Sequence, residues 1–204
     1  MVYLQSDYRH MSDNYNVDLA KNIKSILTEI GEDPQREGLI KTPERVAKSM
    51  SFLTNGYKEN PSEILTSAMF AESYSQMVLV KDIELYSLCE HHMLPFFGKA
   101  HIAYISNGTV VGLSKMNRVV DYFSKRPQVQ ERLTMQVVKE LQSVLNTDDV
   151  ACVIDAKHLC VNSRGIKDTG CSTITSEFGG AFKKPEVREE FLKYIQLETS
   201  FEGL

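Results

Sequence analysis

The stretch 88–95, LCEHHMLP, gathers a thiol, a carboxylate and two imidazoles into four consecutive positions. The whole chain has only five histidines and four cysteines, so this concentration is unusual. In one turn of helix or in a tight turn, Cys89 and His92 at i and i+3 fall on the same side. A thiol and an imidazole at this spacing suit a soft or borderline metal such as zinc, which leaves Glu90 and His91 for other work.

A third ligand is expected from a second segment, in which His158 and Cys160 stand two residues apart. Residues 150–161 have the composition of a strand, and side chains at i and i+2 of a strand share one face. If this strand brings Cys160 to the first pair, the metal has three protein ligands and one open position, as in catalytic zinc sites. His91 and His158 would then be acid–base groups beside the metal.

Two plainer interpretations stay open at this point. A cysteine or histidine in a strand is most often a packed core residue, and we interpret Cys152 in that way. A closed structural zinc site is the other alternative, with His91 or His158 as the fourth ligand. The combination of CEHH in one segment with HxC in another favours a metal site over isolated core residues.

Other polar residues could bind a substrate next to such a metal, although each alone would also fit an ordinary solvated surface. Ser114 and Lys115 at an expected helix start would combine backbone N–H groups with a cation, which suits a phosphate. Glu131 offers a carboxylate that can accept two hydrogen bonds from an amidine-like edge, as guanine presents at N1 and N2. The remaining candidates of this kind are Gln130, Arg118 and Arg164.

The overall composition argues against several classes of protein. Of the 204 residues, 42% are hydrophobic and 25% charged, as in a globular protein with one sizeable domain and a small appendage. No apolar run approaches the roughly 20 residues that cross a bilayer, and the first residues do not resemble a secretory signal. Four cysteines do not make a disulfide framework, and a net charge of −4 argues against wholesale nucleic-acid binding. We expect a cytoplasmic protein without membrane or nucleic-acid partners.

The first third of the chain has the periodicity of helices. Amphipathic spacing predicts a helix over 17–30, and the sequence TPE from Thr42 predicts the start of a second. A third, short helix is predicted to open at Asn60 with the sequence NPS. Residues 1–16 are polar, and we expect them to form a disordered tail.

Strands and longer helices follow. Runs rich in β-branched and aromatic residues predict strands over 77–88, 97–105, 109–113, 150–161 and 171–178. Helices are predicted from Ser114, from Pro127 and from Pro185. This is an α+β pattern, with an antiparallel sheet and helices packed on one face. We expect a tail of residues 1–16, an N-terminal helical region of residues 17–75 and a catalytic domain of residues 76–204.

Three segments, in this order and spacing, closely resemble the GTP cyclohydrolase I family: LCEHHMLPFFGKAHIAYI, VGLSKMNRVVDYFSKRPQVQERLT and DAKHLCVNSRGI. The similarity runs from about residue 42 to the C-terminus, and the leading helix also fits. The resemblance implies the tunnelling fold, assembled as a homodecamer of two pentamers with active sites at subunit interfaces. It also implies a reaction that uses one zinc ion per subunit. That reaction converts GTP and water to 7,8-dihydroneopterin triphosphate and formate, the first step of folate or tetrahydrobiopterin biosynthesis.

The resemblance further implies a role for each matching residue. The zinc ligands match Cys89, His92 and Cys160. His158 matches the acid–base group near N7 of the purine, and His91 matches a histidine that supports proton transfer beside the metal-bound water and the ribose. Glu131, with Gln130, matches the position that recognises guanine. The residues around the ribose and triphosphate match Ser114, Lys115, Arg118, Arg164 and, from a neighbouring subunit, Arg45.

Three alternatives to this interpretation are less consistent with the sequence. A zinc-dependent nucleoside deaminase would need a His-x-Glu and a Cys-x-x-Cys, whereas Glu90 precedes the histidines and no Cys-x-x-Cys exists. The nitrile reductase type of tunnelling-fold enzyme works through a nucleophilic cysteine without this set of ligands. A zinc-stabilised binding module without catalytic activity can be distinguished only by assay. No role follows for Cys171.

Overall fold

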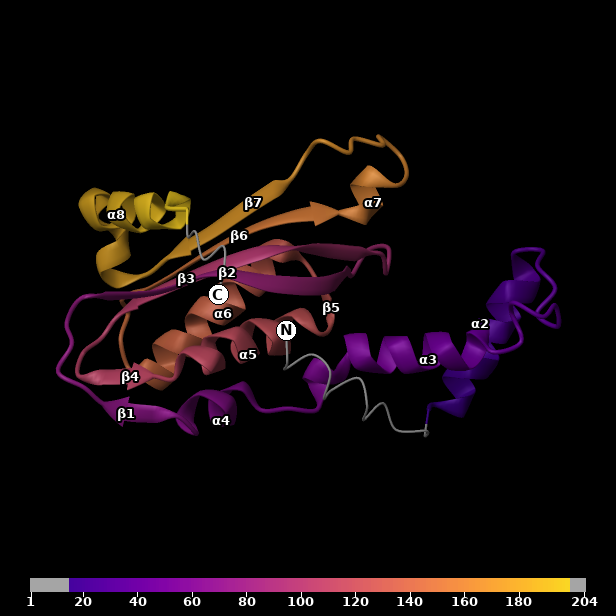
Figure 1. Ribbon diagram of the computed structural model, residues 1–204, viewed down its shortest axis with the longest axis horizontal. Coiled ribbons are helices and arrows are strands. Elements are labelled where there is room, and N and C mark those ends of the chain that lie inside the picture. The colour runs from indigo at the N-terminus through magenta and orange to yellow at the C-terminus, as the bar shows by residue number, and fades with distance from the viewer. Residues whose placement is uncertain (1–14, 199–204) are drawn as a thin grey trace. The chain divides into compact units, whose positions relative to one another are not determined.

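The computed structural model describes residues 15–198, so almost all of the tail predicted over 1–16 lies outside the described part. Contacts within the chain divide it into two compact units, Met1–Asn55 and Gly56–Leu204. The first unit contains α2 (Val17–Glu29) and α3 (Thr42–Leu53), which pack on each other (Figure 1). These two helices are the ones that the periodicity and the TPE sequence predict.

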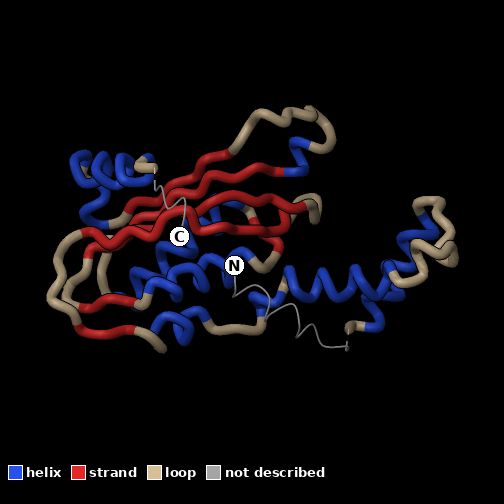
Figure 2. The backbone as a smooth tube through the Cα atoms, in the orientation of Figure 1, coloured by secondary structure: helices blue, strands red, loops and turns tan. Residues whose placement is uncertain are grey.

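The second unit is built on a five-stranded sheet with the order β5-β2-β3-β6-β7, drawn in red in Figure 2. Its strands are β2 (Met77–Cys89), β3 (Pro95–Ile105), β5 (Pro127–Gln128), β6 (Val150–His158) and β7 (Thr173–Phe178). The four longer strands pair antiparallel, as expected, and β5 adds a short parallel pair beside the end of β2. Helix α6 therefore begins at Gln130 and not at Pro127.

Helices cover both faces of this sheet, which corrects the expectation of helices on one face only. On one face lie α5 (Leu113–Ser124) and α6 (Gln130–Leu145), over the larger apolar core. On the other lies α8 (Pro185–Gln196), preceded by the short 3-10 helix η2 (Gly180–Lys183), as Figure 1 shows. The smaller core on that face consists of Ala103, Ala151, Val153, Phe182 and Phe191.

The strand predicted over 109–113 is shorter than expected and does not join the main sheet. It is β4 (Thr109–Val111), which pairs with β1 (Met69–Ala71) in a separate two-stranded sheet. The chain reaches β1 through the 3-10 helix η1 (Asn55–Tyr57) and the predicted short helix, α4 (Pro61–Thr66). None of the helices in residues 15–198 has both the length and the apolar character needed to cross a membrane.

The register of the central strands brings three segments to one end of the sheet. Leu88 of β2 pairs with Pro95 of β3, and Phe96 pairs with His158 at the end of β6. On the other side of β2, Cys89 pairs with Gln128 of β5. The residues that the sequence marks as chemically active therefore gather where β2 and β6 end.

Gly98 lets β3 and β6 approach each other next to this end. A Cβ atom at Gly98 would lie 2.0 Å from the backbone oxygen of Asp155 and 2.6 Å from the Cα atom of Ala156. Because these are backbone atoms of a paired strand, Gly98→Ala is expected to lower the free energy of unfolding by about 1–3 kcal/mol.

Chemical denaturation of the two proteins at the same concentration measures this difference. Gly170→Ala is the matched control, because its Cβ atom would meet only Asp168 Oδ1, at an ordinary 3.5 Å. Equal stability of Gly98→Ala and the wild type would show that the strands can separate at no cost.

Candidate metal centre and active site

The first half of the site is the tight turn between β2 and β3. Cys89 is the last residue of β2 and is buried, whereas His91 and His92 are exposed on the turn. The carbonyl oxygen of Cys89 accepts hydrogen bonds from the backbone N–H of His92 at 3.3 Å and of Met93 at 2.8 Å. Met93 takes a left-handed backbone conformation, with φ of 55°. A turn, not a helix, thus brings Cys89 Sγ and His92 Nδ1 to 3.9 Å.

The second half of the site differs from the strand predicted over 150–161. β6 ends at His158, and the next residues form α7 (Leu159–Asn162), a single helical turn. His158 and Cys160 therefore do not share a strand face, and that part of the prediction is wrong. The next position of β6 would oppose Pro95, which has no backbone N–H to offer, so the ladder stops there.

Cys89, His92 and Cys160 nevertheless come together from these two segments. Their ligand atoms, two sulfurs and one imidazole nitrogen, all lie within 4.8 Å of one another. Ligand atoms around a tetrahedral zinc ion stand about 3.5–3.8 Å apart, so the group needs to contract by about 1 Å at most. In residues 15–198 no other set of three His, Cys, Asp or Glu side chains meets this distance. The three residues could hold a metal ion.

The charge state of this group depends on what it binds. Burial raises the pKa of the Cys160 thiol, and the neighbouring Cys89 sulfur raises it further. A divalent cation between the sulfurs would reverse this preference, because its positive charge favours the thiolate form. Metal binding at this site is therefore coupled to the release of protons.

His158 lies beside the metal ligands in a defined orientation. Its ring stacks on Phe96, with centroids 4.6 Å apart and ring planes 7° from parallel. Its Nε2 atom is 2.7 Å from Oε1 of Gln130. Burial lowers the pKa of His158, and the nearby Glu131 carboxylate opposes that shift. The imidazole is thus held by contacts on its face and at one nitrogen, as a proton-transfer group requires.

The side chain of Gln130, which precedes Glu131 at the start of α6, is engaged within the chain. That side chain is buried, with 2% of the residue exposed, and both of its polar atoms bond within the chain. It therefore contacts His158 and two neighbouring strands, and we do not assign its side chain to guanine. The expected guanine carboxylate, Glu131, is exposed at the start of α6.

Glu90, which the sequence left unexplained, forms an ion pair with Arg132 of α6. Arg132 Nη1 and Nη2 both contact the carboxylate, the latter at 3.2 Å from Oε1. This hydrogen-bonded guanidinium holds the pKa of Glu90 below its ordinary value. The pair ties the metal-binding turn to α6, the helix that also carries Gln130 and Glu131.

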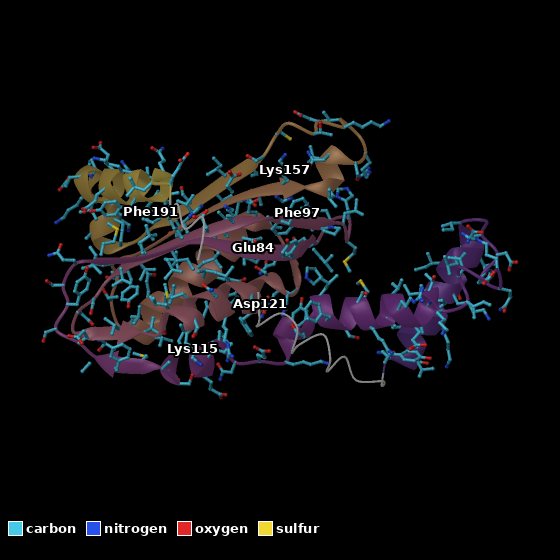
Figure 3. The ribbon with its side chains drawn as sticks, in the orientation of Figure 1. Glu84, Phe97, Lys115, Asp121, Lys157 and Phe191 are labelled. Carbon is cyan, nitrogen blue, oxygen red and sulfur yellow. The ribbon has the colours of Figure 1, made fainter. Side chains whose placement is uncertain are left out.

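The residues expected around the triphosphate do not all lie at this end of the sheet. Ser114 and Lys115 are in the first turn of α5, whose cap is Gly112, and no side chain of the described residues caps it. Lys115 and Arg118 line an open polar pocket of about 630 Å³ together with residues 57–60. About 14 Å of helix separates Lys115 from Ser124, the last residue of α5. Ser124 is the end of α5 that lies toward the Cys89, His92 and Cys160 group. Figure 3 shows Lys115 well apart from Phe97 and Lys157, the neighbours of Phe96 and His158.

The two other predicted arginines lie on different parts of the chain. Arg164 follows α7, is exposed, and lowers the pKa of Cys160 by its charge, so it lies on the metal side. Arg45 is exposed on α3, in the first unit. Cys152 is fully buried, as expected for a packed core residue.

Sequence reasoning missed three residues that shape the site. They are Phe96, Arg132 and Thr175. Phe96 is next to the CEHH cluster in sequence, and the aromatic pair in PFFG is the one signal that could have pointed to a stacking residue. The contacts of Arg132 with Glu90 and of Thr175 with Gln130 join distant parts of the chain, and no local pattern indicates them.

Comparison with known proteins agrees with the geometry. The model of the GTP cyclohydrolase I family matches residues 19–196. Proteins named "GTP cyclohydrolase 1" are similar over most of their length: that of Chlorobium chlorochromatii is 59% identical, over 87% of this chain and 80% of its own. The protein of Bacteroides fragilis is 56% identical, over 88% and 92%. The protein of Flavobacterium johnsoniae is 52% identical, over 97% and 90%.

Among solved structures, the archaeosine synthase QueF-Like in its apo form has a TM-score of 0.45 and 17% identity, over 54% of this chain and 98% of that chain. That likeness is too weak to support an argument. The matches in sequence define the class as a nucleotide-metabolising hydrolase, and the structure adds a Cys-His-Cys group that could hold a metal ion. The chain belongs to the GTP cyclohydrolase I family and is an enzyme of that type.

The ligand assignment predicts the effect of removing one sulfur. Cys160→Ser replaces a thiolate by a hydroxyl, which does not ionise near neutral pH, so the variant is expected to retain no zinc after dialysis. The ratio of bound zinc to protein, from elemental analysis, measures the loss.

Cys171→Ser is the matched control, because Cys171 contacts Asn162 and Asp168 and not the metal group. It should keep one zinc per chain. Stoichiometric zinc in Cys160→Ser would refute the assignment of Cys160 as a ligand.

Proposed function

We propose that the chain converts GTP and water to 7,8-dihydroneopterin triphosphate and formate, the first step of folate or tetrahydrobiopterin biosynthesis. The observation that carries the proposal is the meeting of Cys89, His92 and Cys160 beside the oriented imidazole of His158. We include in the proposal the tunnelling fold and a cytoplasmic location.

The metal of the proposal is zinc, with one ion per subunit. Two thiolates and one imidazole are a donor set that zinc prefers, and three protein ligands leave a position open. When bound there, zinc would lower the pKa of a water molecule toward neutrality and supply a nucleophile for C8 of the purine. The open fourth position supports a catalytic site over a closed structural one.

Two histidines carry the proton transfers in this proposal. His158 protonates the five-membered ring of guanine near N7, which makes C8 more electrophilic. His91, with Nδ1 4.0 Å from Cys89 Sγ, lies on the exposed side of the metal-binding turn. From there it can exchange protons with the ribose during the later rearrangement. His158 thus acts on the guanine base, and His91 acts on the ribose.

Charged side chains orient the substrate. Glu131 accepts hydrogen bonds from N1 and N2 of guanine, and its electrostatic influence on His158 supports a position beside the same purine. The ribose and triphosphate are bound by Ser114, Lys115, Arg118 and Arg164 and, from a neighbouring subunit, by Arg45. Since the net charge of the chain is −4, these cations must act locally on an anionic substrate.

The separation of Lys115 from the metal end supports a site that two copies of the chain share. One copy would contribute the metal group, His158 and Glu131, and its neighbour would contribute Ser114, Lys115 and Arg118. Two strand edges support such an assembly: β5 covers only Leu88 and Cys89 of β2, and no strand of the described residues pairs with the outer edge of β7. An unpaired strand edge can pair with a strand of another copy and so extend the sheet across the interface. The proposed assembly is a homodecamer of two pentamers.

The proposed reaction predicts that zinc-loaded protein incubated with GTP releases one formate for each pterin formed. Formate is measured by a coupled dehydrogenase assay, and the pterin by its absorbance. His158→Ala should keep its zinc and lose turnover, because it removes the proton donor and no metal ligand.

One outcome would decide against this function, and another against the role of His158. Zinc-loaded oligomer that forms neither product would favour a zinc-stabilised binding module. Near-normal turnover in His158→Ala would remove that residue from the reaction.

The shared site predicts complementation between two inactive variants. Lys115→Ala removes a phosphate contact and Glu131→Gln removes the guanine carboxylate, and each is expected to lower kcat/KM by roughly 10–100-fold. If one site takes Lys115 from one copy and Glu131 from another, about a quarter of the sites in a randomly mixed oligomer combine two unaltered halves.

Co-expression of the two variants with different affinity tags and purification through both tags gives such mixed oligomers. Their activity should clearly exceed that of either variant alone. The double variant Lys115→Ala/Glu131→Gln, mixed with itself, is the control and should stay inactive. No gain in the mixed oligomers would contradict a site shared between copies.

A further inference from the structure

A buried amide at the start of α6 contacts the imidazole of His158. The side chain of Gln130 lies between α6 and the ends of β6 and β7, and its Oε1 atom is 2.7 Å from His158 Nε2. An amide oxygen only accepts hydrogen bonds, and an amide nitrogen only donates them. The orientation of this amide therefore decides which ring nitrogen of His158 carries a proton.

The surroundings of Gln130 fix that orientation without reference to His158. Gln130 Nε2 is 3.1 Å from the carbonyl oxygen of Ile154 and 2.9 Å from that of Thr173. Carbonyl oxygens accept and do not donate, so the NH2 group has to be on this side. A flipped amide would place Oε1 against two carbonyl oxygens in the protein interior, at the cost of unsatisfied buried polar groups.

Two threonines complete the network and agree with the same direction. Thr134 Oγ1 donates to the backbone oxygen of Gln130 at 2.9 Å, so its proton is already used. The contact of 2.7 Å between Thr134 Oγ1 and Thr175 Oγ1 must then have Thr175 as the donor. Thr175 Oγ1 keeps lone pairs for the 3.1 Å hydrogen bond from Gln130 Nε2. The two protons of the Gln130 NH2 group serve three acceptors, so one of them is shared, and every contact of the amide nitrogen is to an acceptor.

We infer that Gln130 is a positioning residue that keeps a proton on Nε2 of His158 and so makes Nδ1 the atom that exchanges a proton with the substrate. The inference deepens the proposed function and rests on it. No other hydrogen bond of the His158 ring occurs within residues 15–198, and the stacking on Phe96 fixes the plane of the ring. Of the two ring nitrogens, only Nδ1 is left for the substrate.

The proton balance of the step follows from this arrangement. In the imidazolium form, both ring nitrogens carry a proton, and Nδ1–H gives its proton to a ring nitrogen of the purine. The neutral imidazole that remains keeps its proton on Nε2, in the hydrogen bond to Gln130. The Nδ1 lone pair can later take a proton back. Gln130 touches neither substrate nor metal in this scheme and acts only through His158.

The first test compares two variants that disturb the same network in different ways. Gln130→Met removes the acceptor for Nε2, whereas Thr175→Val keeps the acceptor and the two carbonyl partners of the amide. Gln130→Met is expected to lower kcat by about 10–100-fold, the range for partners that orient an active-site histidine, with little change in KM. Thr175→Val is expected to keep kcat within about threefold of wild type, because the amide orientation survives. Zinc content and oligomeric state should be unchanged in both variants.

A purely structural role of Gln130 would give a different pattern. In that case the loss of kcat in each variant would be proportional to its loss of unfolding free energy. The kcat of Thr175→Val would then decrease together with that of Gln130→Met. That pattern, or wild-type kcat in Gln130→Met, would overturn the inference.

The second test reads the proton position directly. Zinc-loaded protein with 13C,15N-labelled histidine is studied by solid-state NMR in mildly alkaline buffer, where imidazole is neutral. The signals of His158 are identified by their absence in His158→Ala, and Nε2 is recognised because it is bonded to Cδ2. The expected spectrum has a protonated Nε2 and a bare Nδ1, and Gln130→Met should lose this single tautomer. A bare Nε2 in the wild type would refute the inference.

Failure of this inference can be told apart from failure of the proposed function. If the wild type forms no pterin, the proposed function fails, and the NMR spectrum still decides the tautomer. If the wild type turns over GTP and Gln130→Met turns it over equally fast, only the role of Gln130 fails.

Discussion

The register of β3 against its two neighbours is the constraint on which the site depends. Phe96 opposes His158 on one side of β3, and Pro95 opposes Leu88 on the other. A slip of one residue would turn every side chain of a strand to the other face of the sheet. Ile102 and Ile154, both fully buried in the larger core, would then leave it for the opposite face, so the apolar core fixes the register. The meeting of thiols, imidazoles and a stacked ring is therefore determined by packing some distance away from them.

The group that could hold a metal ion could be predicted because its signal is local. Four polar residues in a row and an HxC pair are informative in the sequence, and the structure brings Cys89, His92 and Cys160 together. The helices at 17–30 and from Thr42 were equally predictable, since amphipathic spacing and cap residues are properties of short segments.

Other features depend on partners far away in the chain, and no local pattern indicates them. β6 stops at His158 because its neighbour begins with Pro95, so the geometry of the HxC pair was predicted wrongly. The surroundings of Gln130 come from β6 and β7, and they hold its amide in a buried hydrogen-bond network. The end of a strand and the direction of a buried amide are both tertiary properties.

Neutral and charged groups are separated in this site for a physical reason. The side chains that orient His158 are neutral and buried, so they give direction without the large cost of burying charge. The side chains assigned to the substrate, such as Glu131 and Arg164, are charged and exposed. Water stabilises these charges until a ligand replaces it. The buried neutral side chains thus hold one geometry, and the exposed charged side chains can exchange water for a ligand.

The single turn α7 would couple the binding of a metal ion to the binding of an anion. Four residues are too few for a stable isolated helix, so the position of α7 depends on what holds its two ends. β6 holds the first end, and at the second end Asn162 contacts Asp168 and Cys171. A metal ion on Cys160 would fix the turn between these two ends. Because Arg164 follows within the same short segment, the ion would also restrict where this arginine can reach. Metal and anion would then each favour binding of the other, and by thermodynamic linkage the two effects would be equal in size.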